Sequence, residues 1–173
     1  MKLRANDVEI RVRAGTADDV PALLSFIRAM AEYEKLDAPV TESLLRESLF
    51  GDDAAARTLL AFVDDVPVAY AVYFFTFSTM LGKRGLWLED LFVSPDARRQ
   101  GIGTAVLAYL ADLAIASGCG RFEWFVLDWN TPAIDLYRSM GATILEEWRL
   151  CRLDERGCAE VAERLVRVDE RPG

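Results

Sequence analysis

The sequence contains no histidine among its 173 residues, and it contains only three cysteines. Without histidine, neither a Ser-His-Asp nor a Cys-His catalytic group can form, and no imidazole is available to bind a metal. The cysteines, Cys119, Cys151 and Cys158, are odd in number and match no spacing of a zinc or redox motif, so we expect reduced thiols and no metal. Any catalytic base must then be a carboxylate, a tyrosinate, a lysine or water.

Long apolar runs and excess positive charge are also missing. No stretch approaches the roughly 20 apolar residues of a membrane helix, and the first residues lack the apolar segment of a signal peptide. We therefore expect a cytoplasmic protein that uses no membrane. The net charge of −8 argues against a nucleic-acid partner, although a local basic cluster can still hold a small anion. An acidic surface favours a cationic substrate.

The residues that are present predict a single domain over residues 1–173, with a core at about 8–165, because the hydrophobic content is 52%. Apolar periodicity of 2 predicts strands and of 3.6 predicts helices. The predicted strands are 8–13, 58–63, 66–77, 86–93, 121–127, 142–145 and 148–153, and the predicted helices are 16–34, 41–49, 102–118, 130–140 and 154–165. This order predicts an α/β (α+β) fold, with a mixed, mostly antiparallel sheet of six to seven strands and helices on both faces.

Residues 86–104, LWLEDLFVSPDARRQGIGT, place a strand, a glycine-containing turn and a helix N-terminus in succession. Helix N-termini bind phosphates, glycines let the backbone approach a diphosphate, and Arg98 and Arg99 add charged donors. The segment has neither the Lys-Ser/Thr of a Walker motif nor the third glycine of a dinucleotide fingerprint. A plain turn with two solvated arginines is the alternative that these residues alone leave open.

Glu89 and Asp90 are adjacent carboxylates on the strand before this turn. Glu89 lies in a run of Trp and Leu residues, where burial would raise its pKa and make it a better base. On a regular strand the two side chains point to opposite faces, whereas a bulge brings both to one face. A salt bridge at a strand end is the alternative role of Glu89. Tyr137 lies on the apolar face of a predicted helix, and periodicity alone predicts a core tyrosine there.

Several motifs together resemble the GNAT superfamily of acetyl-CoA-dependent N-acetyltransferases. Val93-Ser94-Pro95 followed by Arg-x-x-Gly-x-Gly-Thr and a helix is typical of that superfamily. YAVYFFTFS, LGK, LWLEDLFV, RRQGIGT, WNTPAIDLYRSMGA and EEWRL, in this order, resemble its diamine (spermidine/spermine) acetyltransferase group over residues 8–165. The resemblance implies direct acetyl transfer from acetyl-CoA to a primary amine of a small cationic substrate (polyamine, diamine or lysine analogue), with no metal, in a homodimer.

The resemblance also implies roles for single residues. Glu89 matches the general base, which acts through water, and Tyr137 matches the acid that protonates the departing coenzyme A thiolate. The implied substrate contacts are Glu34, Asp90, Glu147 and Trp148. The implied coenzyme A contacts are Leu91, Phe92 and Val93 for the pantetheine arm, Arg98, Arg99, Gln100, Gly101, Ile102, Gly103 and Thr104 for the diphosphate, and Asn130.

The chain departs from the diamine group at the proposed amine end. Ser78, Thr79 and Met80 stand where that group has an acid and a Trp, and no glycine precedes Trp148. These departures favour an amine shorter than spermine, such as a diamine or lysine analogue. Two alternatives stay open: a non-catalytic acyl-CoA-binding sensor, against which Glu89 and Tyr137 argue, and an acetyltransferase acting on a protein or another small amine.

Overall fold

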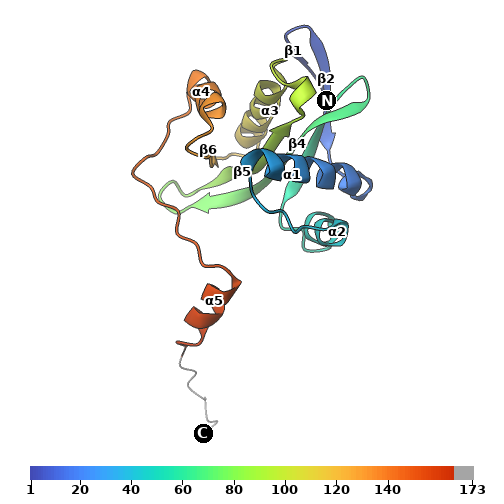
Figure 1. Cartoon of the computed structure of the whole chain (residues 1–173). Coiled ribbons are helices and arrows are strands. Elements are labelled where there is room, and N and C mark those ends of the chain that lie inside the picture. The colour runs from blue at the N-terminus through green and yellow to red at the C-terminus, as the bar shows by residue number, and fades with distance from the viewer. Residues whose placement is uncertain (166–173) are drawn as a thin grey trace. The chain divides into compact units, whose positions relative to one another are not determined.

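The computed structural model describes residues 1–165 (Figure 1). The chain forms two compact units, residues 1–125 and the residues from 126 on, and each unit is described by itself. The expectation of one domain over 1–173, with its core at about 8–165, stays a prediction.

The first unit contains a six-stranded sheet whose strands follow one another in chain order. All neighbouring strands pair antiparallel except the last two, which pair parallel. The strands are β1 (Lys2–Ala5), β2 (Val8–Ala14), β3 (Arg57–Val63), β4 (Val66–Ser78), β5 (Lys83–Val93) and β6 (Arg121–Trp124). The predicted mixed, mostly antiparallel sheet is confirmed. Strand β1 was missed, because its four residues alternate between charged and apolar over too short a stretch to predict a strand.

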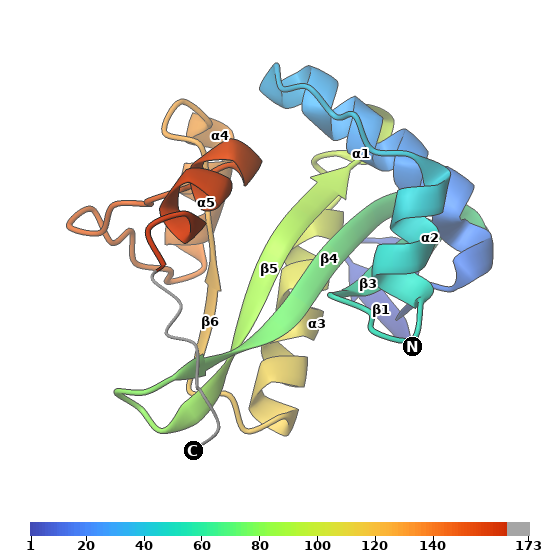
Figure 2. The ribbon, with the colours of Figure 1, turned by 90° about the horizontal axis from the view of Figure 1, so that it is seen from below.

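Helices cover both faces of this sheet: α1 (Val20–Glu34) and α2 (Glu42–Phe50) lie on one face, and α3 (Ile102–Ala116) lies on the other (Figures 1 and 2). The predicted helix at 41–49 begins with a threonine, a residue type that favours the N-cap, and in the structure Thr41 Oγ1 accepts a hydrogen bond from Leu44 N at 3.3 Å. Within residues 1–165, no helix combines the length and the apolar character needed to cross a membrane.

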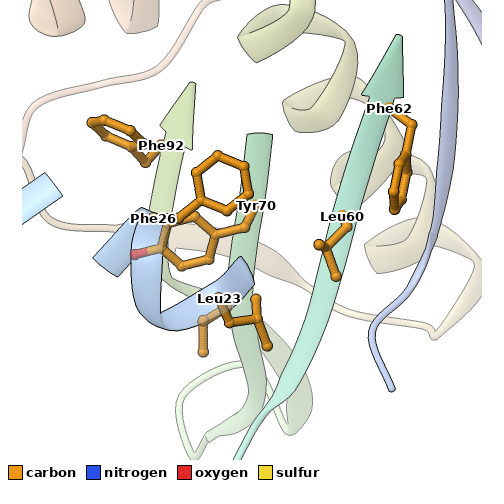
Figure 3. Close-up of a cluster of buried hydrophobic side chains, with 7 residues drawn as sticks. Leu23, Phe26, Leu60, Phe62, Tyr70 and Phe92 are labelled. Atoms are coloured by element: carbon orange, nitrogen blue, oxygen red, sulfur yellow. The ribbon is translucent and has the colours of Figure 1, made fainter. Parts of the chain in front are cut away.

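The core between α1 and the sheet is largely aromatic (Figure 3). The ring of Phe26 on α1 stacks on Tyr70 of β4 with centroids 5.6 Å apart, and it lies 6.4 Å from the ring of Phe92 on β5. Leu23 and Leu60 are fully buried beside them. Each such side chain contributes about 1.5–3 kcal/mol through burial. This packing holds β4 and β5 against α1, and β5 carries the candidate carboxylates Glu89 and Asp90.

Two turns join β3, β4 and β5. Asp64 and Asp65, the two residues left between the predicted strands 58–63 and 66–77, have φ values of 47° and 62° and form a two-residue turn between β3 and β4. Between the predicted strands 66–77 and 86–93, the residues Gly82-Lys83-Arg84-Gly85 predict a turn at 82–85, and this prediction is wrong by three residues. Strand β5 begins at Lys83, so the turn occupies residues 79–82 instead.

The second unit contains α4 (Thr131–Ser139) and α5 (Glu155–Ala162). The predicted helix at 154–165 begins with an aspartate, which favours the N-cap, and in the structure Asp154 Oδ1 accepts a hydrogen bond from Gly157 N at 2.8 Å. The strands predicted at 142–145 and 148–153 are wrong, since both segments are irregular. A strand needs a neighbouring strand to pair its backbone groups, and residues 126–165 contain none. Strand β6 ends three residues earlier than predicted, at the point where its pairing with β5 stops.

Candidate active site

The turn before α3 has the geometry expected of an anion-binding helix N-terminus. Gly101 is the N-cap with φ 79°, and no side chain accepts a hydrogen bond from the first-turn amides as a cap. A Cβ at Gly101 would lie 3.0 Å from the Cβ of Ala5, so both conformation and space require glycine. The other residues predicted to form this turn, Gln100, Ile102, Gly103 and Thr104, lie directly beside it in the chain. The amides of residues 102–104 can therefore donate to a phosphate group.

Arg98 and Arg99, which the sequence pattern places together, have different surroundings. Arg98 Nε donates a hydrogen bond to Val93 O at 3.0 Å. Its guanidinium lies 4.7 Å from the ring centroid of Tyr33 and 5.2 Å from that of Phe92. Arg98 thus links the end of β5 to the end of α1, a contact that the sequence pattern does not show. Arg99 is exposed and has a φ of 62°.

A β-bulge at Glu89 sets the positions of the two adjacent carboxylates. Leu88 and Asp90 pair with consecutive residues of β4, so Glu89 is the extra residue of β5. Asp90 lies opposite Val72, which belongs to the core beneath α1. Glu89 Oε2 accepts a hydrogen bond from Trp87 Nε1 at 3.0 Å. The sequence left open a regular strand or a bulge, and the structure contains the bulge.

Glu89 is exposed in the first unit, so its predicted burial among Trp and Leu side chains is wrong. The bulge is the physical reason. Glu89 is the extra residue of the bulge, so its side chain does not follow the alternating pattern that buries neighbouring side chains of β5. The carboxylate withdrawn from water is that of Asp90, which is half-buried.

The groups around Asp90 shift its pKa in opposite directions. Its Oδ2 accepts a hydrogen bond from the Tyr70 hydroxyl at 3.1 Å. Burial raises the pKa of Asp90 to about 6, the hydrogen bond from Tyr70 counteracts the rise, and the charges of Glu89 and Glu34 add to it. Within residues 1–165, no lysine or arginine forms a salt bridge with Asp90. An arriving ammonium group would therefore favour its ionised form.

Glu34 and Tyr70 complete this cluster of acidic and phenolic groups. Burial raises the pKa of Glu34 at the end of α1. Burial, and then the charge of Asp90, raises the pKa of Tyr70, so its phenol stays protonated and donates at neutral pH. Sequence reasoning placed Glu34 and Asp90 in one site and missed Tyr70. A tyrosine in an aromatic strand looks like any core residue until the cross-strand register is known.

Strands β5 and β6 separate beyond a short parallel pairing. They pair only between residues 85–88 and 121–124, whereas β5 continues to pair with β4 as far as Val93. In the first unit, one edge of β5 is therefore without a strand partner from Glu89 onward. The predicted pantetheine contacts Leu91, Phe92 and Val93 lie on this stretch. An open strand edge presents backbone donors and acceptors to an extended ligand.

Four residues implied by the resemblance belong to the second unit: Asn130, Tyr137, Glu147 and Trp148. Asn130 is the N-cap of α4, and Tyr137 is half-buried on the same helix. Glu147 and Trp148 are exposed in the irregular segment that follows α4. The first unit gathers three carboxylates, and the joint action of those carboxylates with the second-unit residues stays a prediction.

Thiol and metal chemistry have few candidate groups in the part of the chain that is described. The three cysteines are free thiols. Across residues 1–165, no group of three or more His, Cys, Asp or Glu side chains is placed to hold a metal ion.

Comparisons with known proteins identify the family. Residues 21–142 match the acetyltransferase (GNAT) family. The chain is 36% identical over 166 residues to thialysine N-epsilon-acetyltransferase of Sus scrofa, covering 88% of this chain and 97% of that protein. It is 33% identical over 190 residues to L-ornithine N5-acetyltransferase NATA1 of Arabidopsis thaliana, covering 83% of each. An integron cassette protein structure from V. cholerae has the same fold, with a TM-score of 0.76, 24% identity, and coverage of 89% of this chain and 98% of that one.

The fold and these matches define an N-acetyltransferase. The chain belongs to the acetyltransferase (GNAT) family, as the sequence motifs predict. Enzymes of this family use acetyl-CoA as co-substrate, and the two relatives described above are N-acetyltransferases by name.

Proposed function

We propose that this enzyme transfers the acetyl group of acetyl-CoA directly to a primary amine of a small cationic substrate: a polyamine, a diamine or a lysine analogue. The observation that carries the proposal is the bulge at Glu89, which leaves Glu89 and Asp90 close together with Glu34 near them. Among residues 1–165, none of these carboxylates forms a salt bridge. Two relatives carry thialysine and L-ornithine in their names, and both compounds have primary amines.

The start of α3 and the end of β5 are the proposed binding elements for acetyl-CoA. The amides of residues 102–104 and the exposed Arg99 would hold the diphosphate. The open edge of β5 at residues 91–93 would pair with the pantetheine amides, which are donors and acceptors like those of a strand. Asn130 is proposed as a further contact. Arg98 would support this site by fixing the end of β5.

The proposed chemistry begins with loss of a proton from the substrate. An alkylammonium with a pKa near 10, like that of lysine, has no lone pair for attack. Glu89 is exposed, which suits a base that takes the proton through a water molecule. The amine nitrogen then bonds to the thioester carbon, and a backbone N–H near residues 92–93 stabilises the oxyanion. As the carbon–sulfur bond breaks, Tyr137 gives its proton to the sulfur.

The β4–β5 turn supports a short amine as substrate. Ser78 is buried, and its Oγ accepts a hydrogen bond from Leu81 N at 3.3 Å, so this side chain shapes the turn. Met80 is 93% exposed and carries no charge. Neither residue supplies the carboxylate that a long polycation needs at this position. Asp90 and Glu34 would receive the nearer ammonium groups of the substrate, with Glu147 and Trp148 as further contacts.

Turnover on a panel of amines tests this proposal. Release of coenzyme A from acetyl-CoA would be followed with spermine, spermidine, 1,3-diaminopropane, ornithine, lysine and thialysine, and with a lysine-containing peptide. We expect the highest kcat/KM for a short diamine or a lysine analogue. No turnover on any small amine, together with turnover on the peptide, would refute the proposal. We also propose that the protein is a cytoplasmic homodimer. Sedimentation of the full chain would test the oligomeric state.

Replacing Tyr137 with phenylalanine tests the proposed general acid. Because thiolates are already fair leaving groups, Tyr137→Phe should lower kcat by about 10²-fold, at the low end for one proton donor. The KM for acetyl-CoA should change little. An unchanged kcat would remove Tyr137 from the mechanism.

A further inference from the structure

A buried hydroxyl of the first unit contacts the candidate acid group and takes part in no step proposed above. Tyr70 is 1% exposed, and its ring lies beside that of Phe26 (Figure 3). Its hydroxyl lies 3.1 Å from Asp90 Oδ2 and 3.5 Å from Met30 Sδ. Because packing fixes the ring, the direction of the hydroxyl is also fixed.

Burying this hydroxyl costs free energy unless it is hydrogen-bonded, and phenylalanine would fill the same space without that cost. The hydroxyl donates to Asp90, whose other charged neighbours, Glu34 and Glu89, are both acidic. Among these neighbours, Tyr70 alone favours the ionised form of Asp90 over the neutral form. Its hydroxyl therefore acts on the charge state of the carboxylate, beyond filling the core.

We propose that Tyr70 is a positioning residue, which keeps Asp90 ionised and fixed in direction so that Asp90 receives the ammonium group of the amine substrate. This inference rests on the function proposed above. It assigns Tyr70 a role in amine binding and none in acetyl-CoA binding or in the chemical step.

A specific pH dependence follows from the groups that face Asp90, which are Tyr70 from β4, Glu34 from α1 and Glu89 from β5. With a pKa of about 6, Asp90 is mostly ionised at neutral pH, and amine binding strengthens as the pH rises through that value. Loss of the Tyr70 hydroxyl removes the interaction that counteracts burial. The pKa of Asp90 then rises, and the same gain in binding requires a higher pH.

Tyr70→Phe and the matched control Tyr73→Phe test the proposal. Tyr73 is also buried on β4, but its neighbours are Arg57 and Tyr109 and do not include Asp90. The KM of the best amine, the KM of acetyl-CoA and kcat would be measured at pH values on both sides of 6. For Tyr70→Phe we expect an amine KM about tenfold higher at neutral pH, as loss of a hydrogen bond to a charged group predicts. This KM should recover as the pH rises, with acetyl-CoA KM and saturated kcat unchanged and Tyr73→Phe like the wild type.

A pH profile of Tyr70→Phe that matches the wild type would overturn the inference, as would an equal loss of amine binding at every pH or the same shift in Tyr73→Phe. Failure of the proposed function is seen separately, as absence of turnover on every amine by the wild-type enzyme. The titration of the Asp90 carboxyl, followed by ¹³C NMR and assigned with Asp90→Asn, then decides the inference. A higher midpoint in Tyr70→Phe alone supports it, and equal midpoints in wild type and Tyr70→Phe overturn it.

Discussion

Two aspartates of the first unit show how one kind of side chain serves either the fold or a candidate substrate. Asp19, at the start of α1, accepts two hydrogen bonds of 2.7 Å from the guanidinium of Arg13 and one of 2.8 Å from Thr16 N. Asp90, in β5, has one neutral donor, the Tyr70 hydroxyl, and acidic neighbours. Asp19 thus has a salt-bridge partner, whereas Asp90 has none among residues 1–165.

Their pKa values move in opposite directions. Hydrogen bonds from Arg13 lower the pKa of Asp19 to about 2, against the effect of burial. Burial raises the pKa of Asp90 to about 6. Asp19 therefore stabilises the fold above its unfolded pKa, and this contribution is lost as the pH falls toward 2. Ionised Asp90 costs stability above about pH 6, and the cost disappears as the pH falls through that value. A carboxylate that costs stability is a candidate for function.

The largest expected effect is on the chemical step. Because Glu89 is the proposed base, Glu89→Gln should lower kcat by about 10²–10³-fold. Asp19→Asn, a matching loss of one carboxylate in the other region, should leave kcat unchanged at a temperature where the variant is folded. Steady-state kinetics with the best amine measures both variants. Equal kcat values for Glu89→Gln and the wild type would show that Glu89 is not the catalytic base, and that loss of this carboxylate has no more effect on kcat than loss of Asp19.

The next effect is on the free energy of unfolding. Asp19→Asn should lose about 2 kcal/mol at neutral pH, about 30-fold in the unfolding equilibrium, because the lowered pKa of Asp19 measures that stabilisation. The difference from the wild type should shrink as the pH falls toward 2. Urea unfolding at several pH values would show it. A difference that is the same at every pH would mean that the charge of Asp19 is not its source.

Amine binding should respond to Asp90 and not to Asp19. Asp90→Asn removes the proposed charge partner of the ammonium group, so we expect the amine KM to rise about tenfold at neutral pH. The KM for acetyl-CoA should not change, since its proposed contacts lie elsewhere. Initial rates at varied amine and fixed acetyl-CoA provide the measurement. A rise in both KM values would point to a general distortion of β5.

The smallest effect has the opposite sign to that of Asp19. Asp90→Asn removes a half-buried charge beside two carboxylates, so it should stabilise the fold by about 1 kcal/mol above pH 6. The gain should vanish at lower pH, where Asp90 of the wild type is already neutral. Thermal unfolding of both proteins on either side of this pH tests the sign. If Asp90→Asn were less stable than the wild type above pH 6, the claim that ionised Asp90 costs stability would be wrong.

Much of the fold was predictable because its determinants lie close together in the sequence. The ends of α2, the cap at Asp154 and the turn at Asp64-Asp65 each depend on residues within one turn of chain. The strands predicted at 142–145 and 148–153 were wrong because alternation indicates a potential strand, whereas a partner strand decides whether it forms.

The candidate site divides in the same way. Gly101 and the motif around it indicated the glycine turn proposed to bind an anion, and the adjacency of Glu89 and Asp90 indicated a candidate acid group. The exposure of Glu89, the half-burial of Asp90 and the contact with Tyr70 were not predictable. They depend on a one-residue shift in the pairing of β4 with β5, and no residue pattern in either strand predicts this shift.

The amino-acid sequence by itself determined the succession of helices and strands in the first unit from β2 onward, the glycine turn before α3 and the family to which the chain belongs. These features arise from short-range backbone preferences and from motifs of adjacent residues. Only the tertiary structure decided which of two neighbouring carboxylates leaves water, and that a phenol from another strand lies against it. The physical reason is that burial and charge–charge interaction depend on distances across strands and helices, which the order of residues does not specify.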